Sequence, residues 1–332
     1  MHNLLFLIPL IVLALTFDYI NGFHDSANAI ATVISTRALP PGLALIMAAF
    51  FNFIGAFISI EVAKTVGEGI VDPYSITQFV VLAGLIGGIT WNLITWYYGL
   101  PCSSSHSLIG GLAGAVIADQ GVKAINWNKV IGKVVLPSLF SPILGFCMAF
   151  IVMIVFMWIF RKAAPFKINT YFKYFQIFSA ALMALSHGTN DAQKTMGIIT
   201  LALITAGVLH TFSVPLWVKI ACALAMGFGT YAGGWRIIKT MGVKVAKLLP
   251  VHGFVAESTS AFILFANAHL GMPISTTHVI TSAIFGVGAS QRFSAVRWNI
   301  ATNILAAWLF TLPAAAVVSA IMYIIFHIFI IK

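Results

Sequence analysis

Two short stretches of this sequence place a carboxylate beside amide side chains and a glycine, within otherwise apolar surroundings. Residues 21–25 read Asn-Gly-Phe-His-Asp, and residues 187–191 read His-Gly-Thr-Asn-Asp. A carboxylate at the middle of a bilayer costs about 2.5–3.5 kcal/mol even on lenient insertion scales, so acids there are seldom idle. Carboxylate, amide and carbonyl oxygens together suit a small hard cation such as Na⁺. The two stretches therefore predict a cation site formed by Asn21, Asp25, Asn190 and Asp191.

The same residues also allow a structural interpretation. Asp25 or Asp191 could cap a helix, and Lys194 could neutralise Asp191 or bind an anion directly. His24 and His187 could relay protons, although a buried imidazole that bonds to unwound backbone is more common. Because the glycine of each stretch permits an unwound backbone with free carbonyl groups, we favour the cation site.

Three hydroxyl side chains in a row follow a proline at two places. Residues 101–106 read Pro-Cys-Ser-Ser-Ser-His, and residues 273–278 read Pro-Ile-Ser-Thr-Thr-His. Each proline stops the preceding helix, so each triplet stands where a new helix begins. Free backbone N–H groups and the positive end of the helix dipole bind anions there. A single capping residue would explain one hydroxyl, not three at two equivalent positions. The predicted anion-binding residues are Ser103, Ser104, Ser105, Ser275, Thr276 and Thr277.

An internal repeat relates these motifs. The Pro-to-His motif returns after 172 residues, and the stretch 21–25 aligns with 187–191 after 166 residues. Between them, Lys-Thr-Val-Gly at 64–67 matches Lys-Thr-Met-Gly at 239–242. Three matches in the same order, with offsets that differ by only a few residues, indicate that the chain consists of two copies of one unit.

The composition places both copies in a membrane. Of 332 residues, 60% are hydrophobic and 8% are charged, and the mean hydropathy is +1.00. A soluble domain carries about 25% charged residues, so this chain must face lipid over most of its area. The net charge of +10 lies in short basic clusters between apolar runs, which is typical of cytoplasmic loops and not of a nucleic-acid-binding surface.

Apolar runs and polar breaks together predict an all-α membrane protein. Most runs reach the roughly 20 residues that cross a hydrocarbon core, and the shorter ones begin in polar, Gly- or Pro-containing stretches. We expect about 12 transmembrane or half-membrane helices in two inverted-topology repeats with broken helices and re-entrant hairpins. The first repeat covers residues 1–160, with a broken helix over 3–36 and a hairpin over 76–118. The second covers 174–332, with a broken helix over 174–206 and a hairpin over 252–290, and a basic connector over 161–173 joins the two.

The distribution of basic residues predicts the orientation. The connector 161–173, the cluster 236–247 and the two arginines Arg292 and Arg297 fall on one side of such a topology. By the positive-inside rule this side is the cytoplasm, so both termini are predicted to lie outside a plasma membrane that the chain crosses many times. Three lysines between 123 and 133 would then lie outside, against the rule.

Charge balance connects the two predicted sites. If the hairpins enter the membrane from opposite faces, the hydroxyl triplets and the two aspartates meet near its midplane. An oxyanion and two carboxylates would repel each other strongly in a low dielectric. The anion is therefore expected to bind only together with a cation, which is either Na⁺ or H⁺.

Longer stretches around both carboxylates resemble a known family. Residues 17–29 read Phe-Asp-Tyr-Ile-Asn-Gly-Phe-His-Asp-Ser-Ala-Asn-Ala, and residues 187–192 read His-Gly-Thr-Asn-Asp-Ala. Together with the two Pro-to-His motifs, they resemble the duplicated signature of the inorganic phosphate transporter (PiT) family over essentially the whole chain. The resemblance implies symport of phosphate with Na⁺ or H⁺, inverted repeats and usually a homodimer. Some relatives carry phosphate as a metal complex, and some branches carry sulfate.

The resemblance also implies roles for individual residues. It implies that Asp25 and Asp191 belong to the ion and substrate site, with Na⁺ at these aspartates, and that the hydroxyl triplets belong to the phosphate site. We add Asn28 and Gln193 to the phosphate-binding residues. The second signature has Gln-Lys where the first has Ala-Asn, so the two halves need not contribute equally.

These arguments predict a Na⁺-coupled phosphate symporter that works by alternating access. Its expected partners are phosphate, Na⁺, the lipid bilayer and a second copy of the chain, with no cofactor and no nucleic acid. The alternative in the same class is a H⁺-coupled permease for metal phosphate or sulfate, and the alternative of another class is a passive anion channel. An enzyme is not expected, because the sequence has no Ser-His-Asp or His-Glu-x-x-His arrangement.

Overall fold

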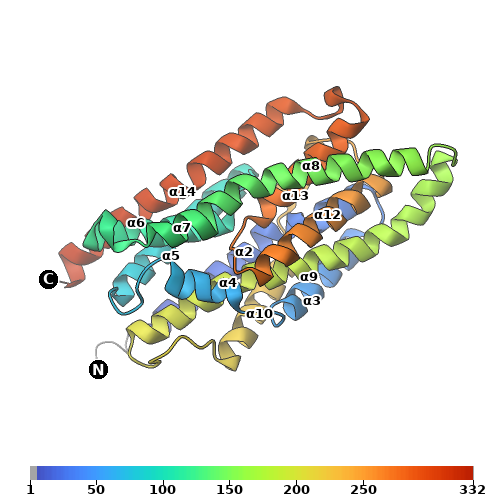
Figure 1. The fold of residues 1–332 in the computed structure, drawn as a ribbon. Helices are drawn as coiled ribbons and strands as arrows, with labels where there is room; N and C mark the ends of the chain where they lie inside the picture. Colours follow the sequence, from blue (N-terminus) through green and yellow to red (C-terminus); the bar gives the residue numbers. More distant parts are fainter. Residues whose placement is uncertain (1–5, 332) are drawn as a thin grey trace.

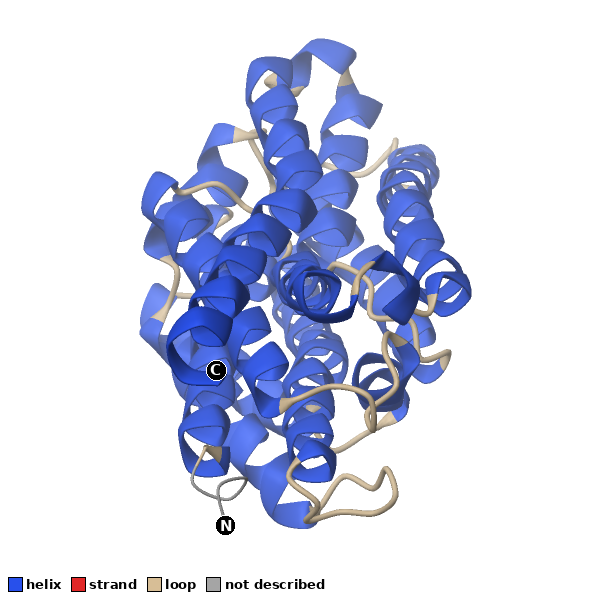
Figure 2. Cartoon of the chain, turned by 90° about the vertical axis from the view of Figure 1, so that its left-hand side faces the viewer, coloured by secondary structure: helices blue, strands red, loops and turns tan. Residues whose placement is uncertain are grey.

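The computed structural model of the protein describes residues 6–331. Over these residues the regular structure is helical, and extended pairing is limited to two isolated β-bridges (Figure 2). The predicted all-α class is thus confirmed. A helix satisfies its backbone hydrogen bonds within one segment, which is the reason that an apolar chain in lipid adopts this structure.

The elements fall into two successive sets that have the same order as far as the 3-10 turns η2 and η5. The first set is α2 (Leu7–Ser35), α3 (Pro41–Gly55), α4 (Glu61–Lys64), η1 (Thr65–Gly69), α5 (Gln78–Tyr98), α6 (Ser104–Gln120), η2 (Val122–Ala124), α7 (Trp127–Val130), η3 (Ile131–Val135) and α8 (Leu136–Ile159). The second set is α9 (Pro165–Thr205), α10 (Leu216–Ala232), α11 (Trp235–Lys239), η4 (Thr240–Lys244), α12 (Pro250–His269), α13 (Thr276–Gln291), η5 (Phe293–Ala295), α14 (Trp298–Phe326) and η6 (His327–Ile331). In both sets a short helix passes into a π-helical turn, as α4–η1 and α11–η4, and a 3-10 turn follows the hairpin, as η2 and η5.

Length and composition identify four segments among the described residues that are long and apolar enough to cross a membrane. They are α2, α5, the run from α7 through α8, and the run from α14 into η6. A fifth candidate is α10 with the segment that follows it, a pair bent by 57°. These criteria do not test the expected number of about 12 spanning or half-spanning helices, which stays a prediction. The apolar windows of α8 and α14 are only 22% buried, so these helices form an outer wall (Figure 1).

The chain ends and the basic connector lie at opposite ends of an elongated bundle. In Figure 1 the two ends of the chain are at the left, where α14 ends. The turn from α8 into α9, which includes residues 161–164 of the connector, is at the right. The three regions are therefore not placed at the same face of the molecule.

The central helices α2 and α9 are continuous, contrary to the predicted breaks. α2 is helical through all of its 29 residues and α9 through all of its 41. The glycines that suggested unwinding allow close packing instead. A Cβ atom on Gly22 would lie 2.5 Å from the carbonyl oxygen of Met226, and one on Gly188 would lie 2.2 Å from that of Asn52. At both points the neighbouring backbone leaves no room for a side chain.

These two helices run antiparallel through the middle of the bundle. Asp18 of α2 lies near Thr195 of α9, and Asp25 lies near His187, so the residue numbers rise on one helix as they fall on the other. The hairpins α5–α6 and α12–α13 pack beside them, and the connections at 99–103 and 270–275 lead into α6 and α13. The fold thus brings the start of α6 and of α13 to the polar residues of α2 and α9.

Candidate functional site

The first serine of each hydroxyl triplet caps a helix. Ser103 Oγ accepts a hydrogen bond from the backbone N–H of His106 at 3.1 Å, and Ser275 Oγ accepts one from the N–H of His278 at 3.1 Å. Each bond satisfies a donor that the first turn of α6 or α13 would otherwise leave free. The capping interpretation therefore holds for the first residue of each triplet, and the second and third hydroxyls have other partners.

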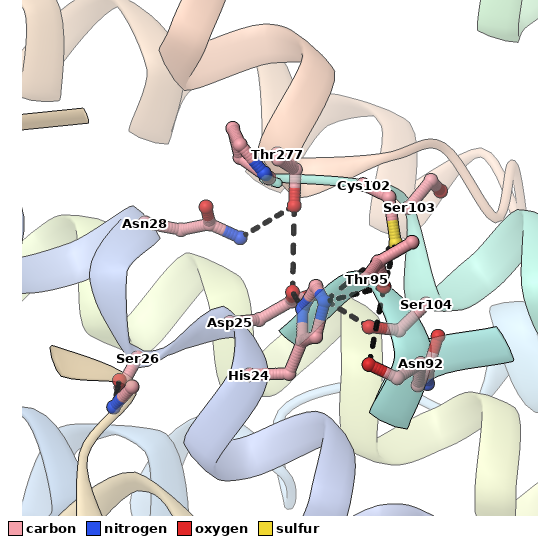
Figure 3. Close-up of polar contacts among 12 residues, drawn as sticks. His24, Asp25, Ser26, Asn28, Asn92, Thr95, Cys102, Ser103, Ser104 and Thr277 are labelled. Atoms are coloured by element: carbon pink, nitrogen blue, oxygen red, sulfur yellow. Dashed lines mark hydrogen bonds and ion pairs between the residues drawn. The ribbon is translucent and has the colours of Figure 1, made fainter. Parts of the chain in front are cut away.

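The second hydroxyl of each triplet contacts the aspartate of its own half. Ser104 Oγ donates to Asp25 Oδ2 at 3.1 Å, and Thr276 Oγ1 donates to Asp191 Oδ2 at 3.2 Å. All four side chains are buried. Figure 3 shows that Asp25 lies between Ser104 on one side and Thr277 on the other, with Thr277 Oγ1 at 3.5 Å. The hydroxyl and the carboxylate are paired in the same way in both halves.

Two matching residues of α2 and α9 connect each helix to the hairpin of the other half. Asn28 Nδ2 donates to Thr276 Oγ1 at 3.1 Å. It also donates to Thr277 Oγ1 at 3.0 Å (Figure 3). At the equivalent position of α9, Lys194 Nζ donates to Ser105 Oγ. The four hydroxyls, the amide and the ammonium group therefore lie together at the start of α6 and α13, where an anion would meet donors from both halves.

Asp25, His187 and Asp191 bring three potential cation ligands together. One ligand atom from each lies within 4.8 Å of the other two, and all three side chains are buried. Lys194 forms an ion pair with Asp191. Asp25 has no lysine or arginine within ion-pair distance among the residues that the structure describes. Its titratable neighbour is His24, whose Nδ1 atom lies 2.6 Å from Asp25 Oδ1. This arrangement can hold a small cation between α2 and α9.

The two histidines bond to side chains and not to unwound backbone. His24 Nε2 lies 3.2 Å from Thr95 Oγ1, and His187 Nδ1 lies 2.9 Å from Asn52 Oδ1. His187 Nε2 also approaches Asp191 Oδ2 at 3.3 Å. The expectation of a backbone partner was wrong because α2 and α9 do not unwind at their glycines.

The amide groups of Asn21 and Asn190 lack partners. Both side chains are buried, and neither the oxygen nor the nitrogen of either amide has a hydrogen bond within the described part of the chain. The Oδ1 atom of Asn28 is also without a partner. A buried polar atom left without a hydrogen bond costs about 1–3 kcal/mol, so a bound cation or anion would stabilise this region.

Gln193 does not join the predicted phosphate-binding residues. Its Oε1 accepts hydrogen bonds from the N–H groups of Val62 at 2.8 Å and Ala63 at 3.3 Å, and its Nε2 donates to the carbonyl oxygen of Thr189. Gln193 thus caps the start of α4 from α9. Successive residues of a helix point about 100° apart, so the neighbour of Lys194 faces a different element.

Lys194 is the site residue whose role the sequence left open. The residue is 1% exposed, and Nζ bonds to Asp191, to Ser105 and to the carbonyl oxygen of Ile274, the last at 3.3 Å. It therefore neutralises Asp191 and reaches a hydroxyl triplet at the same time. The signal in the sequence was its alignment with Asn28 after the 166-residue offset that relates Asp25 to Asp191.

Known proteins resemble this chain over almost its whole length. The family described as "Phosphate transporter family" matches residues 21–319. A "Probable low-affinity inorganic phosphate transporter" of Rhizobium meliloti (strain 1021) is 51% identical over 96% of this chain and 95% of its own length. The protein of the same description from Bacillus subtilis (strain 168) is 50% identical over 98% of both chains. A solved structure described as "The sodium-dependent phosphate transporter" superposes with a TM-score of 0.90 at 24% identity, over 98% of this chain and 99% of that chain.

The family match and the sequence relatives agree with the doubled motifs that surround Asp25 and Asp191. Because the match spans most of the chain and the relatives share half of its residues over nearly their full length, the chain belongs to the phosphate transporter family.

Proposed function

We propose that the protein imports inorganic phosphate in symport with Na⁺ by alternating access. Transport of phosphate is the property of its family, whereas the coupling ion and the mechanism are our proposal. One observation carries it: two buried aspartates between α2 and α9 lie against hydroxyl groups from the starts of two helices. One place therefore offers cation ligands and anion donors together.

The proposed phosphate site consists of the hydroxyls of Ser104, Ser105, Thr276 and Thr277 with Asn28. Without phosphate, Ser104 and Thr276 donate to the two aspartates. A phosphate oxygen can accept these hydrogen bonds instead, and the free N–H groups of the first turns of α6 and α13 add further donors. Ser103 and Ser275 contribute indirectly, because they cap these same helices.

The proposed Na⁺ site consists of Asp25 and Asp191 with the amide oxygens of Asn21 and Asn190. Lys194 offsets the charge of one aspartate, and a bound phosphate adds at least one more negative charge. Like charges repel strongly where the dielectric is low, so phosphate binding requires a cation beside the aspartates. The structural relative is described as sodium-dependent, which supports Na⁺ as that cation.

H⁺ coupling is the second candidate, and one observation favours it. His24 lies 2.6 Å from Asp25, and His187 lies 3.3 Å from Asp191, so each aspartate has an imidazole that could exchange a proton. The sequence relatives are described as low-affinity phosphate transporters, without a coupling ion. The unpartnered amide oxygens of Asn21 and Asn190 favour Na⁺, because a metal cation coordinates several oxygens and a proton satisfies one.

The architecture that we propose has two repeats of opposite topology, 1–160 and 174–332, in a plasma membrane. The antiparallel course of the equivalent helices α2 and α9 supports it, as does the approach of α6 to α13, where the rings of His106 and His278 lie 4.9 Å apart. We place the connector 161–173 in the cytoplasm and both termini outside. A homodimer would cover the apolar groove of about 470 Å³ between α3 and α10, which is lined by the exposed rings of Phe50 and Phe228.

Uptake of radiolabelled phosphate into proteoliposomes tests the proposal. We expect concentrative uptake with an inward Na⁺ gradient, none with an equal K⁺ gradient, and no competition by sulfate. Uptake that does not depend on the Na⁺ gradient but stops when a protonophore is added would instead establish H⁺ coupling. Flux that follows the phosphate gradient alone, without saturation, would establish a channel. Asp72, an exposed acid outside the site, provides the control variant Asp72→Asn, which should transport normally.

A further inference from the structure

The repeated Lys-Thr-x-Gly motif at 64–67 and 239–242 takes no part in the proposed phosphate and Na⁺ sites. Its threonines, Thr65 and Thr240, are the first residues of the π-helical turns η1 and η4. Such turns are rare and are frequently found at functional sites. The same residue at the same irregular turn in both halves indicates a role that the two repeats share.

Each threonine bonds to the hairpin of the other half. Thr65 Oγ1 donates to the carbonyl oxygen of Gly271 at 2.7 Å, and Thr240 Oγ1 donates to that of Gly99 at 2.9 Å. Both glycines have a φ of +65°, the left-handed conformation that commonly ends a helix, here α12 and α5. The connections that follow them lead into α13 and α6, which begin at the hydroxyl triplets. The threonines thus hold the two connections that carry the proposed phosphate ligands.

A basic side chain adds a second donor at each of these helix ends. Lys133 Nζ donates to the carbonyl oxygen of Leu270 at 2.9 Å, and Arg236 Nη1 donates to that of Tyr97. The last carbonyl groups of a helix have no partner within it, and the helix dipole makes this end negative. A hydroxyl and a cationic group therefore stabilise each hairpin end together. We call Thr65 with Lys133 the α12 latch, and Thr240 with Arg236 the α5 latch.

The two latches lie on opposite sides of the proposed site. A Cβ atom on Gly67 of the first motif would lie 2.8 Å from the carbonyl oxygen of Gly197, and one on Gly242 of the second would lie 2.5 Å from that of Ala31. Gly197 and Ala31 each stand six residues beyond the site aspartate of their helix, about 9 Å along its axis. Because α2 and α9 run antiparallel, the α12 latch lies toward the chain ends and the α5 latch toward the connector (Figure 1).

A second acceptor makes each threonine bond easy to release. Thr65 Oγ1 lies 3.3 Å from the carbonyl oxygen of Glu61, and Thr240 Oγ1 lies 3.2 Å from that of Arg236, in both cases four residues back along the chain. A hydroxyl has one hydrogen to donate. When the glycine carbonyl moves away, the hydroxyl can donate to this second carbonyl instead. Opening of a latch therefore does not leave the threonine as a buried donor without a partner.

We propose that Thr65 and Thr240 are positioning residues that hold the two hairpins closed over the phosphate site and release them in turn. The α12 latch opens the site toward the chain ends, and the α5 latch opens it toward the connector. This inference rests on the proposed alternating access. Both latches are formed in the structure, which therefore corresponds to the closed state between the two openings. Loss of one threonine hydroxyl should favour opening on its own side.

Thiol labelling of membrane vesicles tests this side-specific opening. Cys102 is a buried thiol in the connection 99–103, and Ile274→Cys places a thiol at the equivalent position of the connection 270–275. Each reporter is studied alone, with the other cysteines replaced by alanine, and a charged maleimide that does not cross the bilayer is added to one face. Lys167→Cys, at an exposed position of the connector, identifies the vesicles that present the connector face.

We expect each valine variant to act on one reporter. Thr240→Val should raise the labelling rate of Cys102 from the connector face about two- to tenfold, which is the change that loss of one hydrogen bond produces in an equilibrium. Thr65→Val should raise the labelling of the Ile274→Cys reporter from the opposite face by a similar factor. Neither variant should raise the labelling of the other reporter. Equilibrium binding of radiolabelled phosphate should change little, because both hydroxyl triplets are intact.

Matched variants control for the loss of a hydroxyl as such. Thr170→Val removes a hydroxyl that donates to the carbonyl oxygen of Phe166 in its own helix at 2.9 Å, and it should label like wild type. Thr65→Ser and Thr240→Ser keep the hydroxyl and should also label like wild type. If a valine variant does not fold, Lys133→Met or Arg236→Met removes the basic donor of the same latch and should open the same side.

The outcomes distinguish the latches from the proposed function. Unchanged labelling in the valine variants, or a rise of both reporters in either variant, refutes the latches, and phosphate symport stands. If the wild type shows no concentrative phosphate uptake in proteoliposomes, the proposed symport fails and the inference fails with it. A rise confined to one reporter and one face for each threonine, with phosphate binding retained, would establish the latches.

Discussion

Replacing Gly188 by alanine would force α9 away from α3. The added Cβ atom would lie 2.2 Å from the carbonyl oxygen of Asn52 and 2.7 Å from its Cα atom. Ordinary contact begins at about 3.4 Å, so the two backbones must separate by about 1 Å at this point. Overpacking of this kind costs about 1–3 kcal/mol. The separation also weakens the 2.9 Å hydrogen bond between His187 and Asn52, which adds about 1 kcal/mol.

Thermal unfolding of the detergent-purified protein, followed by size-exclusion chromatography, measures this cost. We expect Gly188→Ala to unfold at a clearly lower temperature than wild type. The matched control is Gly132→Ala in η3, where an added Cβ atom meets nothing within 4 Å. Because alanine loses less conformational entropy than glycine in a helix, this control should be neutral or more stable by about 0.5–1 kcal/mol.

Equal unfolding temperatures for the two variants would refute the packing argument. Glycine at position 188 would then be needed for backbone freedom, which predicts that Gly188→Ala loses uptake without losing stability. Loss of stability in Gly188→Ala alone establishes that close contact between α9 and α3 requires the glycine.

Three further predictions concern the site itself. Asp25→Asn and Asp191→Asn should each abolish Na⁺-driven uptake in proteoliposomes while the protein remains folded, because a neutral amide cannot balance the charge of a bound cation. Normal uptake by either variant would show that its aspartate does not belong to the Na⁺ site. Lys194→Met should cost about 3–5 kcal/mol of stability, since it leaves a buried carboxylate uncompensated, and thermal unfolding should show that adding Asp191→Asn restores most of it; failure of this rescue would contradict the ion pair. Ser103→Ala should cost about 0.5–2 kcal/mol of stability as a lost cap with little change in the phosphate KM. Ser104→Ala should raise that KM about 10- to 100-fold, since a hydrogen bond to a charged group contributes about 1.5–3 kcal/mol; equal effects of the two serine variants in uptake assays would refute their separate roles.

The sequence was sufficient to predict the helical class and to identify most of the residues that lie together at the candidate site. Asp25, Asp191 and the two hydroxyl triplets stand out because polar groups are costly in apolar segments and because each motif occurs twice. The repeat makes a common site the simplest arrangement. Contacts such as Ser104 with Asp25 and Thr276 with Asp191 then place equivalent residues in equivalent pairs.

Features that depend on packing were beyond the sequence. Gly22 and Gly188 have the same local signal whether a helix unwinds or another helix approaches closely, and only the position of α3 and α10 decides between them. Gln193 and Lys194 are neighbours, so their roles depend on the rotation of α9 about its axis. Asp18 belongs to the same apolar stretch as Asp25, and its lack of a partner is visible only once α9 and α10 are in place.

The differences between the two halves determine the charge of the site. Asn28 aligns with Lys194, and Asp18 aligns with Ala184, so one half has an additional acid and the other an additional base. With the histidines neutral, the carboxylates of Asp18, Asp25 and Asp191 and the ammonium group of Lys194 leave two negative charges between α2 and α9. Phosphate bound alone as a monoanion would raise this to three, in a medium where like charges repel strongly. If Na⁺ fills the proposed site beside Asp25 and Asp191, the charge returns to two. The form with phosphate alone therefore has the most buried charge, so phosphate without its cation would be the state least able to close and cross.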